Sequence, residues 1–523
     1  MAEENSRSAA RVLLWISAGL TVPAATLVIS GAISVGVPGQ WVMRFAREPD
    51  WSAMVLALPA LGFILLLVGA AYSKIETARL HEEVVTVAML VAFLFAMQFA
   101  VGALGKFGGQ ESFLGVVTPT TNLYFAEAAA VESTSEYLAN YAERAGESEG
   151  WQLKTHPPGP VLFFHGIRTL TKAWPPLRNA ILDLVDSFIS ESSSWRNQEA
   201  FAFLDRSLSR DAEAAGWLAV GVLRLAAALS ALPLYLLARK LYDRQKAIGA
   251  AALGGLVPSL LLFNATVDQL YPLIGLAALL VAYHAVLRRS MLLNLLAGVM
   301  LFIGGMFSVS FLIFLVLIVV VQAWIILVGK KTVDLTRELR ALMLMTESLL
   351  IGVLLCGAGV YIFTGLRYLC FTNWLQCLHA NALFNADTGR TYLAWLVANP
   401  VLFAAFLGLP AAVMFGRRAF SEARELVAKR SLSAADALAV ATVGVLAASW
   451  LYGANLGEVE RLWMPLMPLC AMLGMCALKL DRIAALGLLA LQGLQAIVFR
   501  LSLDPLGLGR IIEDASQTAG ALH

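Results

Sequence analysis

Charged side chains are scarce in this sequence. Of its 523 residues only 14% are charged, whereas 59% are hydrophobic, and the mean hydropathy is +0.74. Soluble domains carry roughly a quarter of charged residues, so this composition excludes an ordinary soluble chain. The net charge is only +2, and the basic residues are spread along the chain instead of forming one patch. We therefore expect no nucleic-acid partner.

Cysteines are also few, and their spacing forms no framework. Three of the five, Cys356, Cys470 and Cys476, stand inside apolar runs as small core residues. Cys370 and Cys377 belong to one expected helix as free thiols, with a disulfide outside the membrane as the alternative. The sequence contains no Walker motif, no GxGxxG after a strand, no HExxH and no Cys/His metal spacing. ATP-driven and zinc chemistries therefore have no support in the sequence.

Long apolar runs, by contrast, are abundant. A run of about 18 or more apolar residues can cross a bilayer as a helix. We therefore predict an all-α polytopic membrane protein with a bundle of about 11 to 13 transmembrane helices. The expected spans lie near residues 12–35, 51–72, 84–105, 214–238, 247–264, 269–287, 291–307, 309–329, 344–365, 393–416, 434–452, 463–478 and 483–502.

The short connections between these spans predict the orientation. If the N-terminus is cytoplasmic, 21 of the 38 lysines and arginines fall in the short inner segments, as the positive-inside rule requires. The chain then divides into N-terminal transmembrane helices (1–105), one long extracytoplasmic loop (106–213) and the remaining bundle (214–523). We expect a multi-pass protein of the bacterial cytoplasmic membrane, in contact with membrane lipids.

The long loop has the pattern of ordered structure. Residues 121–143, rich in Ala, Glu and Leu, predict a helix. Residues 175–194 place Ile181, Leu182, Val185, Phe188 and Ile189 on one helical face. That pattern is typical of a juxtamembrane helix lying in the headgroup plane.

A rigid turn, "KTHPPGPVLFF", interrupts the loop at residues 154–164. Pro157 and Pro158 block a helix, whereas Pro160 can begin the next one. The turn would hold His156 at the water interface beside whatever the loop covers. The alternative is a plain helix-entry turn with an exposed histidine.

Charged residues also stand at the outer ends of several spans. They predict an outward-facing polar cavity, although each alone could be a solvated loop residue. Arg224 is different because it lies inside an expected span, where an arginine is costly unless it is paired or wet. Its alternative is a snorkelling arginine. The other residues of this group are Asp268, His379, Arg390, Glu458, Glu460 and Arg461.

Three motifs point to a known class. They are "YFAEAAAVES" followed by "THPPGPVLFF" in the long loop, "RLAAALSALPLYLLARKLYDRQKAIG" from Arg224 onward, and the late "GEVERLWMPLMPL". On these motifs the sequence resembles the GT-C superfamily of integral-membrane glycosyltransferases, in the dolichyl-phosphate-mannose mannosyltransferase and aminoarabinose transferase-like group. The likeness covers about residues 100–480. One departure is that two additional spans precede the long loop.

The resemblance implies an inverting transfer of a sugar from a polyprenyl-phosphate carrier to a hydroxyl of a lipid, glycan or protein. It places the base at Glu127, with Glu132 as the second choice and Asp268 as a support or substitute. This chemistry requires no metal, although Mg²⁺ or Mn²⁺ could assist. The resemblance also implies that His156, Arg224 and Arg461 bind the donor and its phosphate. Around them it places Glu458, Glu460, His379 and Arg390.

Two other functions use the same residues. A transporter or flippase for a lipid-linked or anionic solute would bind phosphate with the same cations. Transporters usually contain repeats with broken spans in matching positions, and no internal repeat stands out in the sequence. In a catalytically silent membrane subunit, all of these acids would be surface residues.

Overall fold

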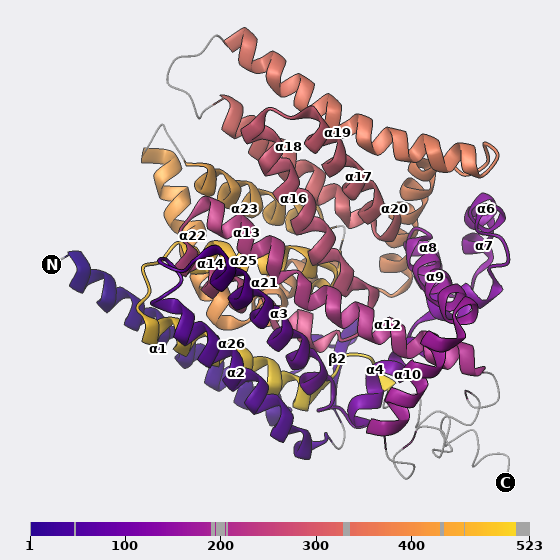
Figure 1. Cartoon of the computed structure of the whole chain (residues 1–523), viewed down its shortest axis with the longest axis horizontal. Helices are drawn as coiled ribbons and strands as arrows, with labels where there is room; N and C mark the ends of the chain where they lie inside the picture. Colours follow the sequence, from indigo (N-terminus) through magenta and orange to yellow (C-terminus); the bar gives the residue numbers. More distant parts are fainter. Residues whose placement is uncertain are drawn as a thin grey trace.

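The computed structural model describes residues 2–46, 49–189, 194, 204, 208–327, 335–428, 433–453 and 455–508, and these are mostly helical (Figure 1). Nine helices in this part of the chain are long and apolar enough to cross a membrane, or ten if one bent pair counts as a span. The all-α polytopic membrane fold is thereby confirmed. The nine are Ala10–Ile29, Trp51–Tyr72, Leu80–Gly102, Arg210–Leu241, Val267–Arg288, Val309–Leu327, Leu335–Phe363, Ala434–Tyr452 and Arg482–Ser502.

The described part of the chain therefore holds fewer full-length spans than the predicted 11 to 13. The expected span 247–264 is broken into α14 (Arg244–Gly255) and α15 (Pro258–Leu262), because Pro258 cannot continue the preceding helix. The expected span 393–416 is divided at Gly408, whose φ of +95° is not helical. Two further expected spans are the short apolar helices Met291–Phe307 and Met464–Cys476.

The N-terminal part contains a small sheet that the hydropathy pattern did not predict. Helix α1 (Ala2–Ile29) ends earlier than the expected span 12–35, and the chain forms β1 (Val35–Val37) and β2 (Trp41–Phe45). Strand β2 pairs antiparallel with both β1 and β3 (Leu503–Asp504). Next come η1 (Trp51–Ala53), α2 (Met54–Tyr72) and α3 (Leu80–Gly102).

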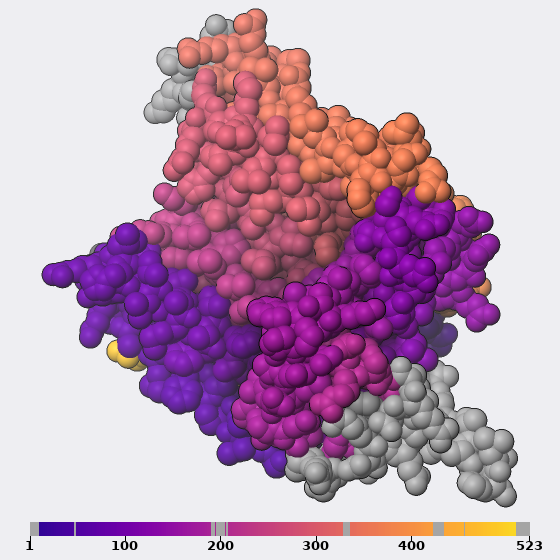
Figure 2. Space-filling model, turned by 45° about the vertical axis from the view of Figure 1, so that its right-hand side comes forward, coloured from indigo at the N-terminus to yellow at the C-terminus, as the bar shows by residue number. Residues whose placement is uncertain are grey.

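The long loop is a layer of short helices at one end of the bundle, on the right of Figure 1. It contacts the bundle across sequence-distant elements: the Trp151 ring lies 5.5 Å from Phe384, and the Ser135 hydroxyl donates to the Phe363 carbonyl at 2.7 Å. Figure 2 shows this layer as a continuous purple cover. Its elements are η2 (Gly108–Gln110), α4 (Glu111–Val117), α5 (Leu123–Glu127), η3 (Ala128–Ala130), α6 (Thr134–Ala139), α7 (Tyr141–Glu147), α8 (Trp151–Thr155), α9 (Gly159–Ala173) and α10 (Pro175–Phe188).

The structure corrects one helix of this loop and confirms another. The single helix predicted over 121–143 is broken, because Val131 is extended and Ser133 caps a new helix by accepting from the Glu136 amide. The amphipathic helix after Pro175 is present as α10, with Leu182 buried and Phe188 82% exposed. The predicted turn is also present, since α8 ends at Thr155 and Pro160 lies in the first turn of α9.

The remaining bundle surrounds a buried centre made by α14 and α25 (Met467–Cys476). All ten residues of α25 are buried. All five cysteines are free thiols. The other elements are α12 (Arg210–Leu229), α13 (Ala231–Leu241), η7 (Val267–Gln269), α16 (Leu270–Arg288), α17 (Met291–Phe307), η8 (Val309–Phe311), α18 (Leu312–Leu327), α19 (Leu335–Phe363), α20 (Cys370–Asp387), α21 (Tyr392–Leu407), α22 (Leu409–Ala428), α23 (Ala434–Tyr452), α24 (Val459–Leu462), η9 (Met464–Leu466) and α26 (Arg482–Ser502).

Candidate functional site

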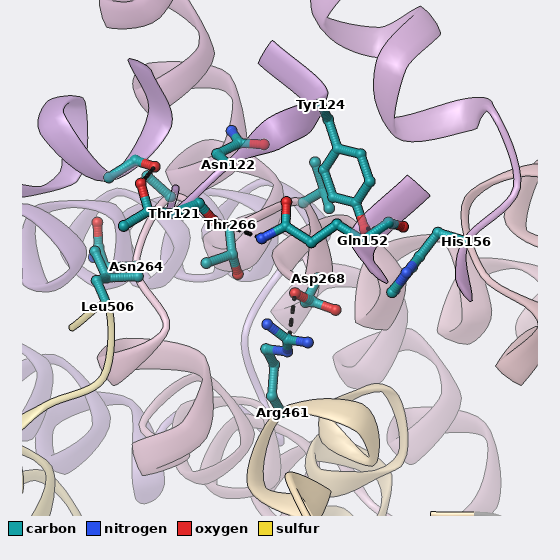
Figure 3. Close-up of a pocket in the computed structure, with 13 residues that line it drawn as sticks. Thr121, Asn122, Tyr124, Gln152, His156, Asn264, Thr266, Asp268, Arg461 and Leu506 are labelled. Atoms are coloured by element: carbon teal, nitrogen blue, oxygen red, sulfur yellow. Dashed lines mark hydrogen bonds and ion pairs between the residues drawn. The ribbon is translucent and has the colours of Figure 1, made fainter. Parts of the chain in front are cut away.

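A cavity lies between the loop layer and the ends of the bundle helices beneath it (Figure 3). Its volume is about 50 Å³. An apolar cavity that holds a benzene ring is about 150 Å³, so this one must widen before a larger ligand enters. The lining residues are Gly115, Thr121, Asn122, Tyr124, Gln152, His156, Asn264, Ala265, Thr266, Val267, Asp268, Arg461 and Leu506.

An ion pair forms the floor of the cavity. Asp268 in η7 is 5% exposed, and its Oδ2 lies 3.8 Å from Nε of Arg461 in α24. Figure 3 shows both side chains pointing toward one another from separate elements. Nε of Arg461 is buried and has no hydrogen-bond partner among the described residues. This hydrogen-bond donor faces the Asp268 carboxylate and is not used in a hydrogen bond within the described part of the chain.

Glu458 stands behind this pair, between two arginines. Its Oε1 accepts from Nη2 of Arg390 at 2.7 Å, and its Oε2 lies 3.3 Å from Nη2 of Arg461. Burial acts to raise the pKa of Glu458, but the charges of Arg461 and Arg390 lower it below its usual value. Arg390 also donates to the Leu456 carbonyl at 2.8 Å and lies over the Phe384 ring. Arg390 and Glu458 thus position Arg461 from outside the lining.

Glu460 is in a different environment, although it neighbours Arg461 in the sequence. It is 1% exposed, and its Oε2 has no partner in the described part of the chain. Its backbone carbonyl accepts from the Ser259 hydroxyl. Burial, with the charge of Glu458, raises the pKa of Glu460 to about 8. Glu460 therefore carries a proton near neutral pH.

His156 faces the ion pair from the loop side. Its ring lies 5.7 Å from the Tyr124 ring, and its Nδ1 lies 3.0 Å from the Thr155 hydroxyl. Burial, together with the positive charge of Arg461, lowers the pKa of His156 to about 4. The imidazole is therefore neutral at physiological pH and can both donate and accept a hydrogen bond.

Arg224 lies behind the cavity wall. It is 1% exposed, so it does not snorkel to the membrane surface. Its Nε donates to Asn264 Oδ1 at 2.6 Å, its Nη2 donates to the Ser112 hydroxyl at 2.8 Å, and its guanidinium lies over Phe99. Among the described residues no carboxylate pairs with it. Arg224 reaches the cavity only through Asn264, a lining residue.

In addition to Arg224, Arg390, Glu458 and Glu460, three predicted site residues are not in the cavity lining. Glu127 is bound by Arg144, whose Nη2 and Nε lie 2.7 and 3.1 Å from Glu127 Oε1. Glu132 is exposed, and His379 is exposed on α20. The roles predicted for them have no support from the cavity geometry and remain predictions.

Several neutral lining residues were not predicted. Asn122, Tyr124 and Gln152 belong to the loop layer, and Thr266 precedes Asp268. Neutral side chains stand out in a membrane protein far less than charged ones. The only available signal was that Tyr124 begins the motif around Glu127 and that Asn122 lies two residues before it.

The part of the chain that the structure describes contains no group of three or more His, Cys, Asp or Glu residues placed to hold a metal ion. No model of a protein family matches the chain, and neither a curated protein nor a solved structure matches it.

Proposed function

We propose that the protein is a membrane glycosyltransferase that moves a sugar from a polyprenyl-phosphate carrier to a hydroxyl acceptor, with inversion. The observation that supports this proposal is the meeting of three groups in one cavity: the Asp268 carboxylate, the Arg461 guanidinium and the neutral His156 imidazole. They are provided by the loop layer and by two separate elements of the bundle. The resemblance of three sequence motifs to those of GT-C enzymes suggests the reaction class.

Each group matches one requirement of the transfer. The acceptor oxygen attacks the anomeric carbon of the donor, and its proton passes to a carboxylate, for which we propose Asp268. The bond from that carbon to the phosphate oxygen breaks, and its electron pair stays on the phosphate. Arg461 stabilises the departing phosphate, which then needs no protein acid. His156 contributes a hydrogen bond from the loop side.

Asp268 is a better base than Glu127 on geometric grounds. Asp268 lines the cavity, and its ion pair with Arg461 is long, at 3.8 Å. Glu127 is paired at 2.7 Å with Arg144 outside the lining, so this short ion pair would have to break before Glu127 could take a proton from an acceptor. Glu127 and Glu132 remain the alternatives if the loop layer rearranges around the donor.

The test is direct. Purified protein in detergent is mixed with polyprenyl-phosphate sugars and with short-chain alcohols or glycans as acceptors, and release of polyprenyl phosphate is measured. We expect release from at least one donor. If no donor is consumed, but the protein moves a labelled donor across vesicle membranes, the function is transport and the proposal is wrong.

The proposed location follows from the same reaction. Because the cavity lies between the 106–213 loop and the bundle, the lipid-linked donor would enter it at the membrane surface on which that loop lies. With a cytoplasmic N-terminus, this is the outer face of the membrane, and a bacterial cytoplasmic membrane would supply a polyprenyl-phosphate carrier. The acceptor is a hydroxyl-bearing lipid, glycan or protein at that face. A divalent cation is not required by the proposed steps.

A further inference from the structure

The charges that line the cavity are balanced before any ligand enters. Asp268 and Arg461 are the ionised side chains among the described lining residues, and they pair with each other. His156 is neutral, because its pKa is lowered to about 4. The other lining side chains are amides, hydroxyls or apolar groups. When the donor phosphate binds Arg461, Asp268 is left to the acceptor hydroxyl, so the lining offers no further charge to a sugar that bears its own.

Asn122 is a neutral lining residue whose side-chain oxygen makes no hydrogen bond to a described residue. This Oδ1 atom is also buried. An amide of this kind offers two donors and an acceptor, which suits adjacent hydroxyl groups. A buried polar atom left without a partner is costly. A ligand hydroxyl would remove that cost.

The neutral side chains beside Asn122 are already engaged. The Thr121 hydroxyl donates to the Gly115 carbonyl at 2.8 Å. Oε1 of Gln152 accepts from the Leu123 amide at 2.8 Å, and the Tyr124 hydroxyl donates to the Gln152 carbonyl at 3.3 Å. These bonds hold the segment that contains Asn122 in place. The side chain of Asn122 is thus positioned, while its Oδ1 keeps an unused acceptor for a ligand hydroxyl.

We infer that the sugar transferred by this site is uncharged, and that Asn122 recognises its hydroxyl groups. The inference rests on the proposed function and names its substrate class. Asn122 lies on the loop side of the cavity, and Arg461 lies on the bundle side (Figure 3). Each has a buried polar atom without a hydrogen-bond partner among the described residues. A donor whose phosphate contacts Arg461 and whose hydroxyls contact Asn122 places its anomeric carbon between them, on the side of Asp268.

The experiment compares three classes of polyprenyl-phosphate donor: an uncharged hexose or pentose, an amino sugar with a free amine, and a uronic acid. Release of polyprenyl phosphate and equilibrium donor binding are both measured, so that binding is tested even without turnover. Wild-type protein is compared with Asn122→Ala and Asn122→Asp. The matched control is Asn140→Asp, because Asn140 is a half-buried asparagine of the same loop outside the lining.

The wild type should prefer the uncharged donor at least about tenfold over both charged donors, since a site that hydrogen-bonds hydroxyls discriminates against ligands that cannot satisfy it. Asn122→Ala should weaken binding of the uncharged donor about tenfold. Asn122→Asp should shift the preference toward the amino sugar about tenfold or more, because it adds an unpaired negative charge. Asn140→Asp should leave the preference unchanged.

Preference of the wild type for a charged donor would overturn the inference, as would an unchanged preference in Asn122→Asp. Either result leaves the proposed transfer intact, provided that polyprenyl phosphate is released. Binding preference for the uncharged donor without release from any donor would instead refute the transfer and retain the inference about the ligand.

Discussion

Arg461 is charged but loosely held. Its contacts to Glu458 and Asp268 measure 3.3 and 3.8 Å, and its Nε has no hydrogen-bond partner among the described residues. Burial acts to lower the pKa of Arg461, but Asp268 and Glu458 raise it above its usual value. The guanidinium is therefore always charged and can turn to a phosphate without breaking a short hydrogen bond.

Arg461→Lys should bind the donor about tenfold more weakly than the wild type, because an ammonium keeps the charge but loses the planar fork. Arg461→Leu should bind it more weakly still. Donor binding is measured by titration in detergent. Arg144→Lys is the control, since Arg144 pairs with Glu127 outside the cavity lining. Equal losses in the two lysine variants would contradict a phosphate contact at Arg461.

Asp268→Asn should lower turnover about a hundredfold to ten-thousandfold, the usual contribution of a general base. Donor binding should change little, because other residues hold the phosphate. Glu127→Gln and Glu132→Gln, measured side by side, should lose at most a few-fold. A dead Glu127→Gln with an active Asp268→Asn would return the base to the loop motif. Three active variants would remove every carboxylate proposed as the base and favour transport.

The raised pKa of Glu460 predicts how the stability of the protein depends on pH. Its pKa in the folded protein is about 8, above the ordinary value of 4.5. A raised pKa means that the folded state holds this proton more tightly than the unfolded state does. Its contribution to stability is therefore complete below pH 4.5 and is lost as the pH rises through 8. The melting temperature in detergent should fall between pH 6 and 9, and Glu460→Gln should flatten that fall. An equal fall in the variant would assign the effect to another group.

Charge explains which site residues the sequence could reveal. Asp268 and Arg461 were predicted because ionised groups at a membrane edge are uncommon, and the structure brings them together. Glu127 was predicted from a motif alone, and Arg144, its partner, carries no signal that distinguishes it from a surface arginine. Asn122 is neutral and lies in a polar loop, so only the three-dimensional arrangement shows that its Oδ1 has no hydrogen-bond partner among the described residues.

At the scale of elements, a buried carboxylate joins three helices at the other end of the bundle. Glu83 of α3 lies 3.0 Å from Arg239 of α13 and 3.4 Å from Arg244 of α14, and it accepts from the Tyr235 hydroxyl at 2.7 Å. Glu83 is only 2% exposed, whereas the two arginines are partly exposed.

Glu83→Ala should destabilise the protein by about 3 kcal/mol, the lower end for breaking a buried ion pair, because both arginines can partly rehydrate. Glu83→Gln should lose less, since it keeps a hydrogen bond to Tyr235. Thermal unfolding in detergent measures both. Glu82→Ala is the control, because Glu82 only caps the first turn of α3. Equal effects at the two positions would show that the ion pair is not what stabilises this end.

Helices were predictable from hydropathy, but their breaks were not. The run 247–264 is apolar throughout, yet Pro258 divides it into two short helices. Hydropathy measures how apolar a segment is, and residues of the protein core are as apolar as residues facing lipid. An apolar run therefore does not show whether it forms one membrane span or two short buried helices. The hairpin of β1 and β2 was not predicted for a different reason. Its strands of three and five residues are too short to give a periodic pattern.

At the scale of the whole molecule, the loop layer and the Glu83 cluster lie at opposite ends of the bundle. We expect cysteines introduced at Lys106 and Trp151 to be labelled by a membrane-impermeant reagent from outside the cell, and a cysteine at Arg244 only after the membrane is opened. The native cysteines are replaced first. Labelling at Trp151 only from the cytoplasmic side would place the cavity on the wrong face for the proposed reaction.

The pairing of β2 with β3 also has a consequence for how the protein is made. Strand β2 is complete after residue 45, but its partner starts at Leu503, after α26. Similarly, Glu111 in the loop layer is buried against Arg500. A nascent chain therefore carries an open edge on β2 and an unpaired Glu111 carboxyl at the loop-layer end of the bundle until α26 has been synthesised. A chain whose synthesis stops before Arg500 cannot close this end, so we expect it to be degraded and not to accumulate in the membrane.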